Sequence, residues 1–245
     1  MTRRKLPIGI QTFAKLREEG CYYVDKTPLL LRLVREGSFY FLSRPRRFGK
    51  SLLIDTLAEL FEGNRPLFDG LHAEANWDWS KSYPVIRISF ADGVLHSAER
   101  LQQRILDNLR QNAERLGVTF PPGLDVPGQF GELIRQARAS HGQRAVVLVD
   151  EYDKPILDNI TDGAIARQMR DGLRDLYSVI KGQDAHIQFA MLTGVSKFSL
   201  FSGLNNLPDI TVSADYSAIC GYTDEDADTA FAPQLPALDP AQIRT

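Results

Sequence analysis

The residues best suited to chemistry lie between Ser43 and Ser51, a run that reads Ser-Arg-Pro-Arg-Arg-Phe-Gly-Lys-Ser. A short apolar, aromatic segment at residues 38–42 precedes it and is typical of a buried strand. Residues 50–61 follow with leucine and isoleucine at helical spacing, which predicts a helix. A strand, a loop and a helix in this order form the setting of a phosphate-binding loop, the P-loop or Walker A motif.

The chemistry of such a loop depends on unpaired backbone N–H groups at the start of the helix. These groups and the helix dipole attract the oxygens of a phosphate. We expect Lys50 to reach the β- and γ-phosphates of ATP, and the hydroxyl of Ser51 to bind Mg²⁺. Gly49 lets the backbone approach the ligand closely. The residues predicted to bind the cofactor are Arg46, Arg47, Phe48, Gly49, Lys50 and Ser51.

The start of this loop departs from the usual motif. A glycine normally stands five positions before the second glycine, and here that position is Arg44, followed by Pro45. Arginine lacks the φ freedom of glycine, and proline has no N–H to offer. The positive charges of Arg46 and Arg47 are expected to compensate near the phosphates.

An acidic cluster follows a second apolar segment, residues 145–149, which is typical of a strand buried on both faces of a parallel sheet. An apolar strand that ends in Asp150 and Glu151 fits the Walker B pattern. We expect Asp150 to hold Mg²⁺ and Glu151 to orient and activate the attacking water. Asp153 is a further carboxylate without an assigned role. A charged turn after a buried strand is the competing interpretation.

A third apolar segment, residues 187–192, ends in Thr193, Gly194, Val195, Ser196 and Lys197. A polar residue at this end can sense the γ-phosphate and position water, and Thr193 is our candidate. The predicted catalytic residues are therefore Glu151, Lys50 and Thr193, and the predicted metal ligands are Ser51 and Asp150. No arginine is assigned as a finger that acts on the γ-phosphate.

The elements around these residues alternate between strand and helix. A further strand is predicted at residues 85–90, with helices at 97–116, 130–139 and 164–180. This order favours an α/β fold with a mainly parallel sheet flanked by helices, in which ligands sit at the carboxyl ends of the strands. Since the strand at 85–90 lies between the two motif strands in the chain, we expect the additional-strand class of P-loop NTPases.

Composition narrows the functional classes. The net charge of −2 gives no overall attraction to nucleic acid or to an anionic membrane. No apolar run reaches the roughly 18 residues that a membrane helix needs. Two distant cysteines, Cys21 and Cys220, favour a reducing cytoplasm over a disulfide framework. We therefore expect a cytoplasmic protein without a membrane partner.

Five ordered motifs together resemble the bacterial AAA-ATPase-like domain family over nearly the whole chain. The motifs are residues 22–27, 43–51, 149–155, 193–199 and 202–207. The resemblance implies that the Arg-Pro-Arg-Arg-Phe form of the loop is normal for the family. It also implies that Tyr23 to Lys26 flank the nucleotide.

Members of this family usually continue into a restriction-endonuclease-like nuclease domain at the C-terminal side. The resemblance therefore implies a P-loop ATPase domain at residues 1–222, followed at 223–245 by the start of a truncated downstream region. It also implies that the domain is the motor or switch of a larger, nuclease-associated protein. DNA, a nuclease domain and a second copy of the chain remain open as partners.

Alternatives to a working ATPase also remain open. One is a nuclease that uses Asp150, Glu151 and Asp153 as metal ligands. A restriction-type nuclease site needs an acidic residue two positions before a lysine. No lysine in this chain has an acidic residue at that position, which argues against such a site. Another is a nucleotide-dependent switch with little hydrolysis. A third is a DNA-binding module that uses the basic loop. The four histidines are scattered and predict no metal site.

Overall fold

A computed structural model describes residues 4–197 and 207–233 of the chain. At its centre lies a four-stranded, entirely parallel sheet in the order β1-β4-β3-β2. The strands are β1 (Phe39–Ser43), β2 (Val85–Ser89), β3 (Ala145–Asp150) and β4 (Ile187–Gly194). The α/β class and the parallel sheet expected from the sequence are confirmed.

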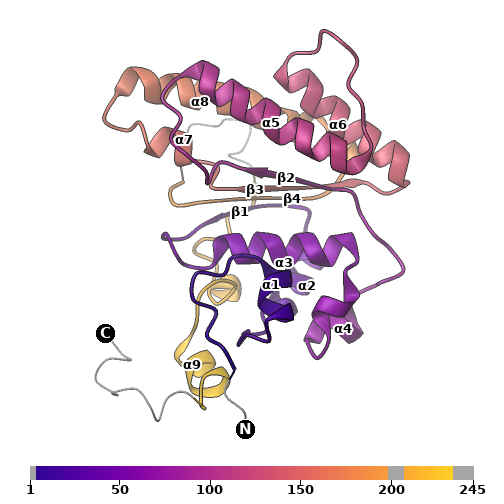
Figure 1. The fold of residues 1–245 in the computed structure, drawn as a ribbon, viewed down its shortest axis with the longest axis vertical. Helices are drawn as coiled ribbons and strands as arrows, with labels where there is room; N and C mark the ends of the chain where they lie inside the picture. The colour runs from indigo at the N-terminus through magenta and orange to yellow at the C-terminus, as the bar shows by residue number, and fades with distance from the viewer. Residues whose placement is uncertain (1–3, 198–206, 234–245) are drawn as a thin grey trace.

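Helices cover both faces of the sheet (Figure 1). One face carries α5 (Ala98–Leu116), α6 (Val126–His141) and α8 (Gly163–Gly182). The other face carries α1 (Phe13–Glu18), α2 (Thr27–Glu36), α3 (Lys50–Glu62) and α4 (His72–Asn76). The short helix α7 (Lys154–Leu157) lies at the end of the sheet where β3 finishes.

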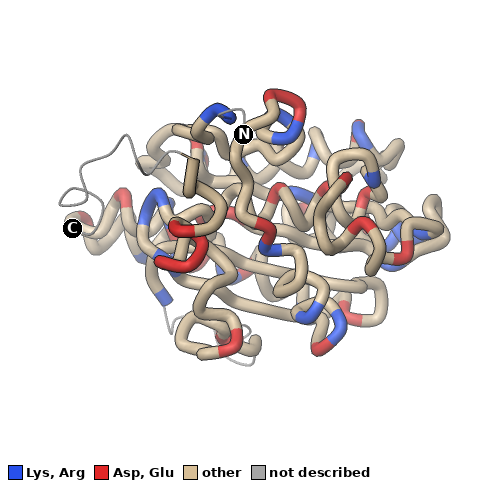
Figure 2. Tube along the Cα trace, turned by 90° about the horizontal axis from the view of Figure 1, so that it is seen from below, with Lys and Arg blue, Asp and Glu red and all other residues tan. Residues whose placement is uncertain are grey.

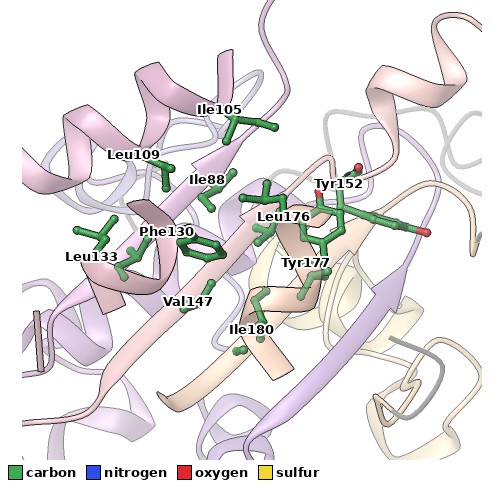
Figure 3. Packing of buried hydrophobic residues seen from close by; sticks show 14 of the residues in the cluster. Ile88, Ile105, Leu109, Phe130, Leu133, Val147, Tyr152, Leu176, Tyr177 and Ile180 are labelled. Atoms are coloured by element: carbon green, nitrogen blue, oxygen red, sulfur yellow. Dashed lines mark hydrogen bonds between the residues drawn. The ribbon is translucent and has the colours of Figure 1, made fainter. Parts of the chain in front are cut away.

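The apolar pattern of β3 explains why this strand occupies the interior of the sheet. All six of its residues are buried, and the five apolar ones alternate between two cores. Val147 and Val149 pack under α5, α6 and α8, in the core that Figure 3 shows. Val146 and Leu148 pack on the other face against α2 and α3. A strand buried on both faces needs a continuous apolar run, as the sequence predicted.

The outer edge of the sheet is closed by side chains of α5. Asn112 accepts from the backbone N–H of Arg87 at 2.9 Å and donates to the carbonyl of Arg87 at 2.7 Å. Asn108 makes the same pair of bonds to Ser89, at 3.0 and 3.3 Å. These amides take the place of a neighbouring strand, so the edge of β2 is not left as an open template for pairing.

The opposite edge of the sheet is extended by a short piece of chain. The N–H of Phe41 donates to the carbonyl of Pro208 at 3.0 Å, and the N–H of Ile210 donates to the carbonyl of Phe41 at 3.0 Å. Phe41 and Asp209 thereby form a parallel bridge beside β1.

Several boundaries differ from those expected. Residues 64–83, predicted to be irregular, contain a 3₁₀ helix at Arg65–Phe68 and helix α4. Helix α6 begins at Val126 because the Asp125 carboxylate accepts from the N–H of Gly128 and caps it. Further 3₁₀ turns occur at Asp184–His186 and Ala214–Tyr216.

Helix α9 (Asp224–Ala230) was not anticipated, and it lies in the segment assigned to a downstream region. Thr223 and Asp226 form a capping box at its start, a signal that the sequence carried. Lys26 Nζ bonds Asp226 Oδ2 at 2.5 Å, so α9 is tied to the segment before α2. Within residues 4–197 and 207–233, no helix is both long and apolar enough to cross a membrane.

Candidate functional site

The predicted site residues meet at the carboxyl edge of the sheet. Ser43 at the end of β1 pairs in register with Gly194 of β4, and Leu42 pairs with Thr193. Asp150 at the end of β3 lies beside Ser89 of β2. Strand β4 lies between β1 and β3, so the phosphate loop and the acidic cluster flank the third predicted strand end. This edge is where parallel α/β sheets bind ligands.

The loop from Ser43 to Ser51 curls around the amine of Lys50. Lys50 is buried, with 3% of its surface exposed, and its Nζ donates to the carbonyls of Arg44 at 3.0 Å and Pro45 at 3.1 Å. These two bonds use two of the three protons of the ammonium group. Among the described residues no acceptor takes the third proton, which leaves it for a ligand that enters the loop.

The start of α3 is prepared for an anion. Gly49 occupies its N-cap position with φ of 85°, a left-handed conformation that favours glycine, and no side chain caps the first turn. Other helices use such caps: Ser97 caps α5 and Asp162 caps α8. The uncapped N–H groups and the positive end of the helix dipole leave α3 able to bind a phosphate.

The arginine at the start of the loop has a structural role that explains the absence of glycine. The guanidinium of Arg44 donates to the carbonyl of Thr211 at 2.5 Å, and the backbone N–H of Arg44 donates to the carbonyl of Gly194 at 3.1 Å. Arg44 has no positive φ. Arg44 therefore anchors the loop to β4 and to residue 211, and its backbone geometry does not require glycine.

The carboxylate of Asp150 is held by its neighbours. Thr193 Oγ1 donates to Asp150 Oδ1 at 2.7 Å, and the backbone N–H of Glu151 donates to the same oxygen at 3.1 Å. Asp150 is 7% exposed and Thr193 is fully buried. Thr193 thus contacts the predicted metal ligand directly. A buried hydroxyl bonded in this way is suited to orienting Asp150.

Glu151 stands in a strained backbone conformation. Its φ is 55°, in the left-handed region that costs a non-glycine residue about 1 kcal/mol or more. Partial burial raises the pKa of its carboxyl, the positive charge of Lys50 lowers it, and the negative charge of Asp150 raises it; the net shift is upward. A half-buried carboxyl with a raised pKa, close to Lys50 and Asp150, suits a group that takes a proton from water.

A comparison with models of known protein families decides which family the chain represents. The family model described as "Predicted AAA-ATPase" matches residues 7–202. The chain belongs to this AAA-ATPase-like family. It is also 61% identical over 248 residues to a protein of Azotobacter chroococcum mcd 1 named "Uncharacterized protein in vnfD 5'region". That alignment covers all of this chain and 48% of the relative, so the chain spans about half the relative's length. No solved structure matches it.

Asp153, which sequence reasoning left without a role, organises the loop after β4 in this AAA-ATPase-like chain. It is fully buried, and its Oδ2 accepts from the N–H groups of Val195 at 3.0 Å and Ser196 at 2.7 Å. A Cβ on Gly194 would lie 2.5 Å from Asp153 Oδ1, so only glycine fits there. Burial raises the pKa of Asp153, and the two backbone bonds lower it; the net shift is upward. Asp153 therefore holds the loop after β4 in place beside the candidate site.

The motif at residues 22–27 has a largely structural role in the described contacts. Asp25 accepts from the N–H of Thr27 at 2.9 Å at the start of α2 and from the N–H of His72 at 2.7 Å at the start of α4. Tyr23 is packed edge-on against Phe13. Lys26 pairs with Asp226, as described above. Phe198, Ser199 and residues 202–206 of the other family motifs lie outside the described residues.

Sequence reasoning also missed the contact between the C-terminal part of the chain and the phosphate loop. Gly221 has φ of 74°, and a Cβ there would lie 2.7 Å from the ring of Phe48. The thiol of the neighbouring Cys220 is buried; burial raises its pKa to about 12, against the lowering effect of the nearby charges of Arg44 and Lys50. The signal available in the sequence was the glycine at position 221.

The metal prediction rests on few protein ligands. Among the described residues, no three or more His, Cys, Asp and Glu side chains are grouped to hold a metal ion. Mg²⁺ beside a nucleotide needs only one or two carboxylates, since phosphates and water complete its shell. Asp150, fixed by Thr193, and the hydroxyl of Ser51 at the uncapped start of α3 fit that requirement.

Proposed function

We propose that this chain is an ATP-binding domain that hydrolyses ATP with Mg²⁺. The observation that carries the proposal is the position of Lys50. Its buried ammonium group is bonded to the carbonyls of Arg44 and Pro45 inside a loop that leads into an uncapped helix. A charge fixed in this way binds a phosphate without the entropy cost of ordering a free lysine.

The strand order supports membership of the additional-strand class of P-loop NTPases. In that class another strand lies between the loop strand and the strand that carries the acidic pair. Here this strand is β4, whereas the strand at 85–90 on which the sequence argument relied is β2, at the edge of the sheet. The bridge between Phe41 and Asp209 adds chain on the far side of β1.

Each site residue has a role in the proposed reaction. Lys50 neutralises charge on the β- and γ-phosphates, and the N–H groups at the start of α3 bind their oxygens. Ser51 and Asp150 hold Mg²⁺, which supplies charge neutralisation on the phosphates. Glu151 accepts a proton from the attacking water. Thr193 keeps Asp150 oriented through the bond to its Oδ1.

The charge distribution favours a nucleotide over a DNA backbone as the loop's ligand. Acidic and basic positions are interspersed on the face seen in Figure 2. Lys50, the central charge of the loop, is buried and turned onto loop carbonyls. DNA and a nuclease domain are retained as partners of the whole protein, with this domain as its motor or switch. The free, buried Cys21 and Cys220 favour the cytoplasm.

The experiment that tests the proposal is ATP binding by calorimetry and ATP hydrolysis, each with and without DNA. Lys50→Ala is expected to weaken ATP binding by at least about 100-fold, since it removes a buried charge–phosphate contact worth about 3 kcal/mol. Lys15→Ala is the matched control, because that lysine is 61% exposed. Unchanged ATP affinity in Lys50→Ala contradicts the proposal.

Two other results favour the alternatives. Salt-sensitive DNA binding that does not depend on ATP supports the DNA-binding alternative. ATP binding without turnover supports the switch.

A further inference from the structure

We propose that the chain holds the base of the nucleotide in an apolar pocket beside the phosphate loop, and that this pocket does not distinguish adenine from guanine. The proposal rests on the proposed function, because it takes the triphosphate to lie on the loop. The pocket has a volume of about 260 Å³ and joins the two ends of the described chain. It is lined by Leu6, Pro7, Ile8, Tyr222 and Phe231.

The chain that leads into the pocket lies against the phosphate loop. Gly221, whose neighbour Tyr222 lines the pocket, packs against the ring of Phe48 so closely that a Cβ would lie 2.7 Å from it. The backbone nitrogen of Gly221 lies 3.6 Å from the position of a Cβ on Gly49. Tyr222, which lines the pocket, therefore follows directly after a residue that contacts the loop proposed to bind the phosphates. A nucleotide held on the loop can place its base in this pocket.

The walls of the pocket are held in place by specific contacts. The ring of Phe231 lies 5.5 Å from that of Tyr22 and 5.1 Å from that of Tyr222, the latter at an edge-on angle of 83°. The bond between Lys26 and Asp226 fixes α9, which ends next to Phe231. Figure 1 shows α9 close to the N-terminal segment, on the side of the sheet that carries α3. These contacts hold the side of the pocket that Tyr222 and Phe231 form.

The size and chemistry of the lining indicate the kind of occupant. Whole ligands of drug size occupy roughly 300–1,000 Å³, so this pocket suits one part of a ligand. Aromatic and aliphatic side chains offer a base a surface for stacking. Tyr222 and Ile8 are 56% and 84% exposed, large apolar surfaces that a flat base would cover.

Two backbone carbonyls among the described residues of the pocket are already bonded within the chain. The carbonyl of Leu6 accepts from the N–H of Ile8 at 2.9 Å, and the carbonyl of Pro7 accepts from the N–H of Ile10 at 3.3 Å. Pro7 has no N–H. Because stacking works on the flat face that every base has, it tolerates a change of base. We therefore expect ATP and GTP to bind with affinities within about fivefold of each other.

The test compares three ligands on the full chain: ATP, GTP and inorganic tripolyphosphate, which has no base. Tyr222→Ala is expected to lower the affinity for ATP and for GTP by about 5- to 100-fold, the range measured for a lost stacking partner. It leaves the affinity for tripolyphosphate unchanged. Ile160→Ala is the matched control, because Ile160 is 62% exposed and lies outside the pocket. Photolabelling with 8-azido-ATP is expected to mark peptides that contain residues 6–8 or 222–231.

The outcomes separate this proposal from the proposed function. If Tyr222→Ala binds ATP as well as the unaltered chain does, the base pocket is wrong while the phosphate loop stands. A preference of more than 100-fold for ATP over GTP in the unaltered chain also overturns it, because stacking alone gives no such preference. If neither ATP nor tripolyphosphate binds the unaltered chain, the proposed function itself fails. Unchanged tripolyphosphate affinity in Tyr222→Ala excludes misfolding as the cause of the loss. Tyr222→Phe keeps the ring and is expected to keep ATP affinity, which assigns the effect to the ring.

Discussion

The outer edge of β2 and the carboxyl edge of the sheet differ in how far their polar groups are hydrogen-bonded. Along the outer edge of β2, Asn108 and Asn112 satisfy both the N–H and the carbonyl of the residues that they face. At the carboxyl edge, and within the part of the chain that the structure describes, the first turn of α3 has no side-chain cap and the ammonium of Lys50 keeps one proton unused. The fold satisfies its backbone where no ligand is needed and leaves donors open where a phosphate is expected to bind.

Backbone strain follows the same division. Within the described part of the chain, Arg47 and Glu151 are the non-glycine residues with positive φ, and both lie at the carboxyl edge. Residues in sparsely populated conformations persist where the surroundings hold them, and they concentrate at functional sites. The hydrogen bonds along the outer edge stabilise the fold. The strained backbone at the carboxyl edge destabilises it slightly and positions side chains.

The largest expected effect comes from Glu151. Glu151→Gln is expected to keep ATP binding within about threefold and to lower turnover by about 100- to 10,000-fold, because the amide cannot accept the proton of water. Glu151→Gly is expected to lose turnover equally, yet to raise the free energy of unfolding by about 1 kcal/mol, since glycine relieves the left-handed backbone. Phosphate release and urea unfolding measure the two effects.

These two variants separate chemistry from strain at one position. Turnover that survives in Glu151→Gln removes Glu151 as the proton acceptor and leaves ATP hydrolysis itself standing. Loss of stability in Glu151→Gly would mean that the side chain, which lies near Lys50 and Arg46, contributes more than the strain costs.

The outer edge is tested by Asn112→Leu. Asn112 is 4% exposed, and leucine would leave both backbone groups of Arg87 without their partner. At about 1–3 kcal/mol for each of the two unsatisfied groups, we expect the free energy of unfolding to fall by about 2–6 kcal/mol, with ATP affinity unchanged. Urea unfolding measures the loss. Gln111→Leu on the exposed face of α5 is the control, expected within about 0.5 kcal/mol of the unaltered chain. A loss below 1 kcal/mol for Asn112→Leu would mean that the asparagines do not stabilise this edge.

The comparison also explains what the sequence could and could not predict. Periodicity located the four strands and the long helices, because apolar residues at fixed spacing must face a core. The loop at 43–51 and the pair Asp150–Glu151 were found because chain order alone places them after strands. The strand between them in space could not be derived, because chain order does not fix sheet order.

Contacts between distant residues explain the remaining differences. The sequence showed only that Arg44 stands where the usual motif has glycine. Its structural role depends on a bond to the carbonyl of Thr211, which lies 167 positions away in the chain. Asn108 and Asn112 resembled ordinary polar positions of a helix until the edge of β2 was beside them. Gly221 and α9 come to the loop from the far end of the chain, and no local pattern indicates that.

The smallest expected effect tests how firmly the carboxyl edge is organised. Thr193→Val removes the 2.7 Å bond to Asp150 Oδ1 and leaves the N–H of Glu151 as the donor to that oxygen. We expect turnover to fall about tenfold, equivalent to about 1.4 kcal/mol, and the Mg²⁺ concentration for half-maximal turnover to rise several-fold. Thr56→Val is the matched control, because the hydroxyl of that buried threonine donates within α3 to the carbonyl of Leu52. If Thr193→Val lowers turnover at every Mg²⁺ concentration without changing the Mg²⁺ requirement, Thr193 acts on the phosphate or the water, as the sequence first suggested, and its bond to Asp150 is incidental.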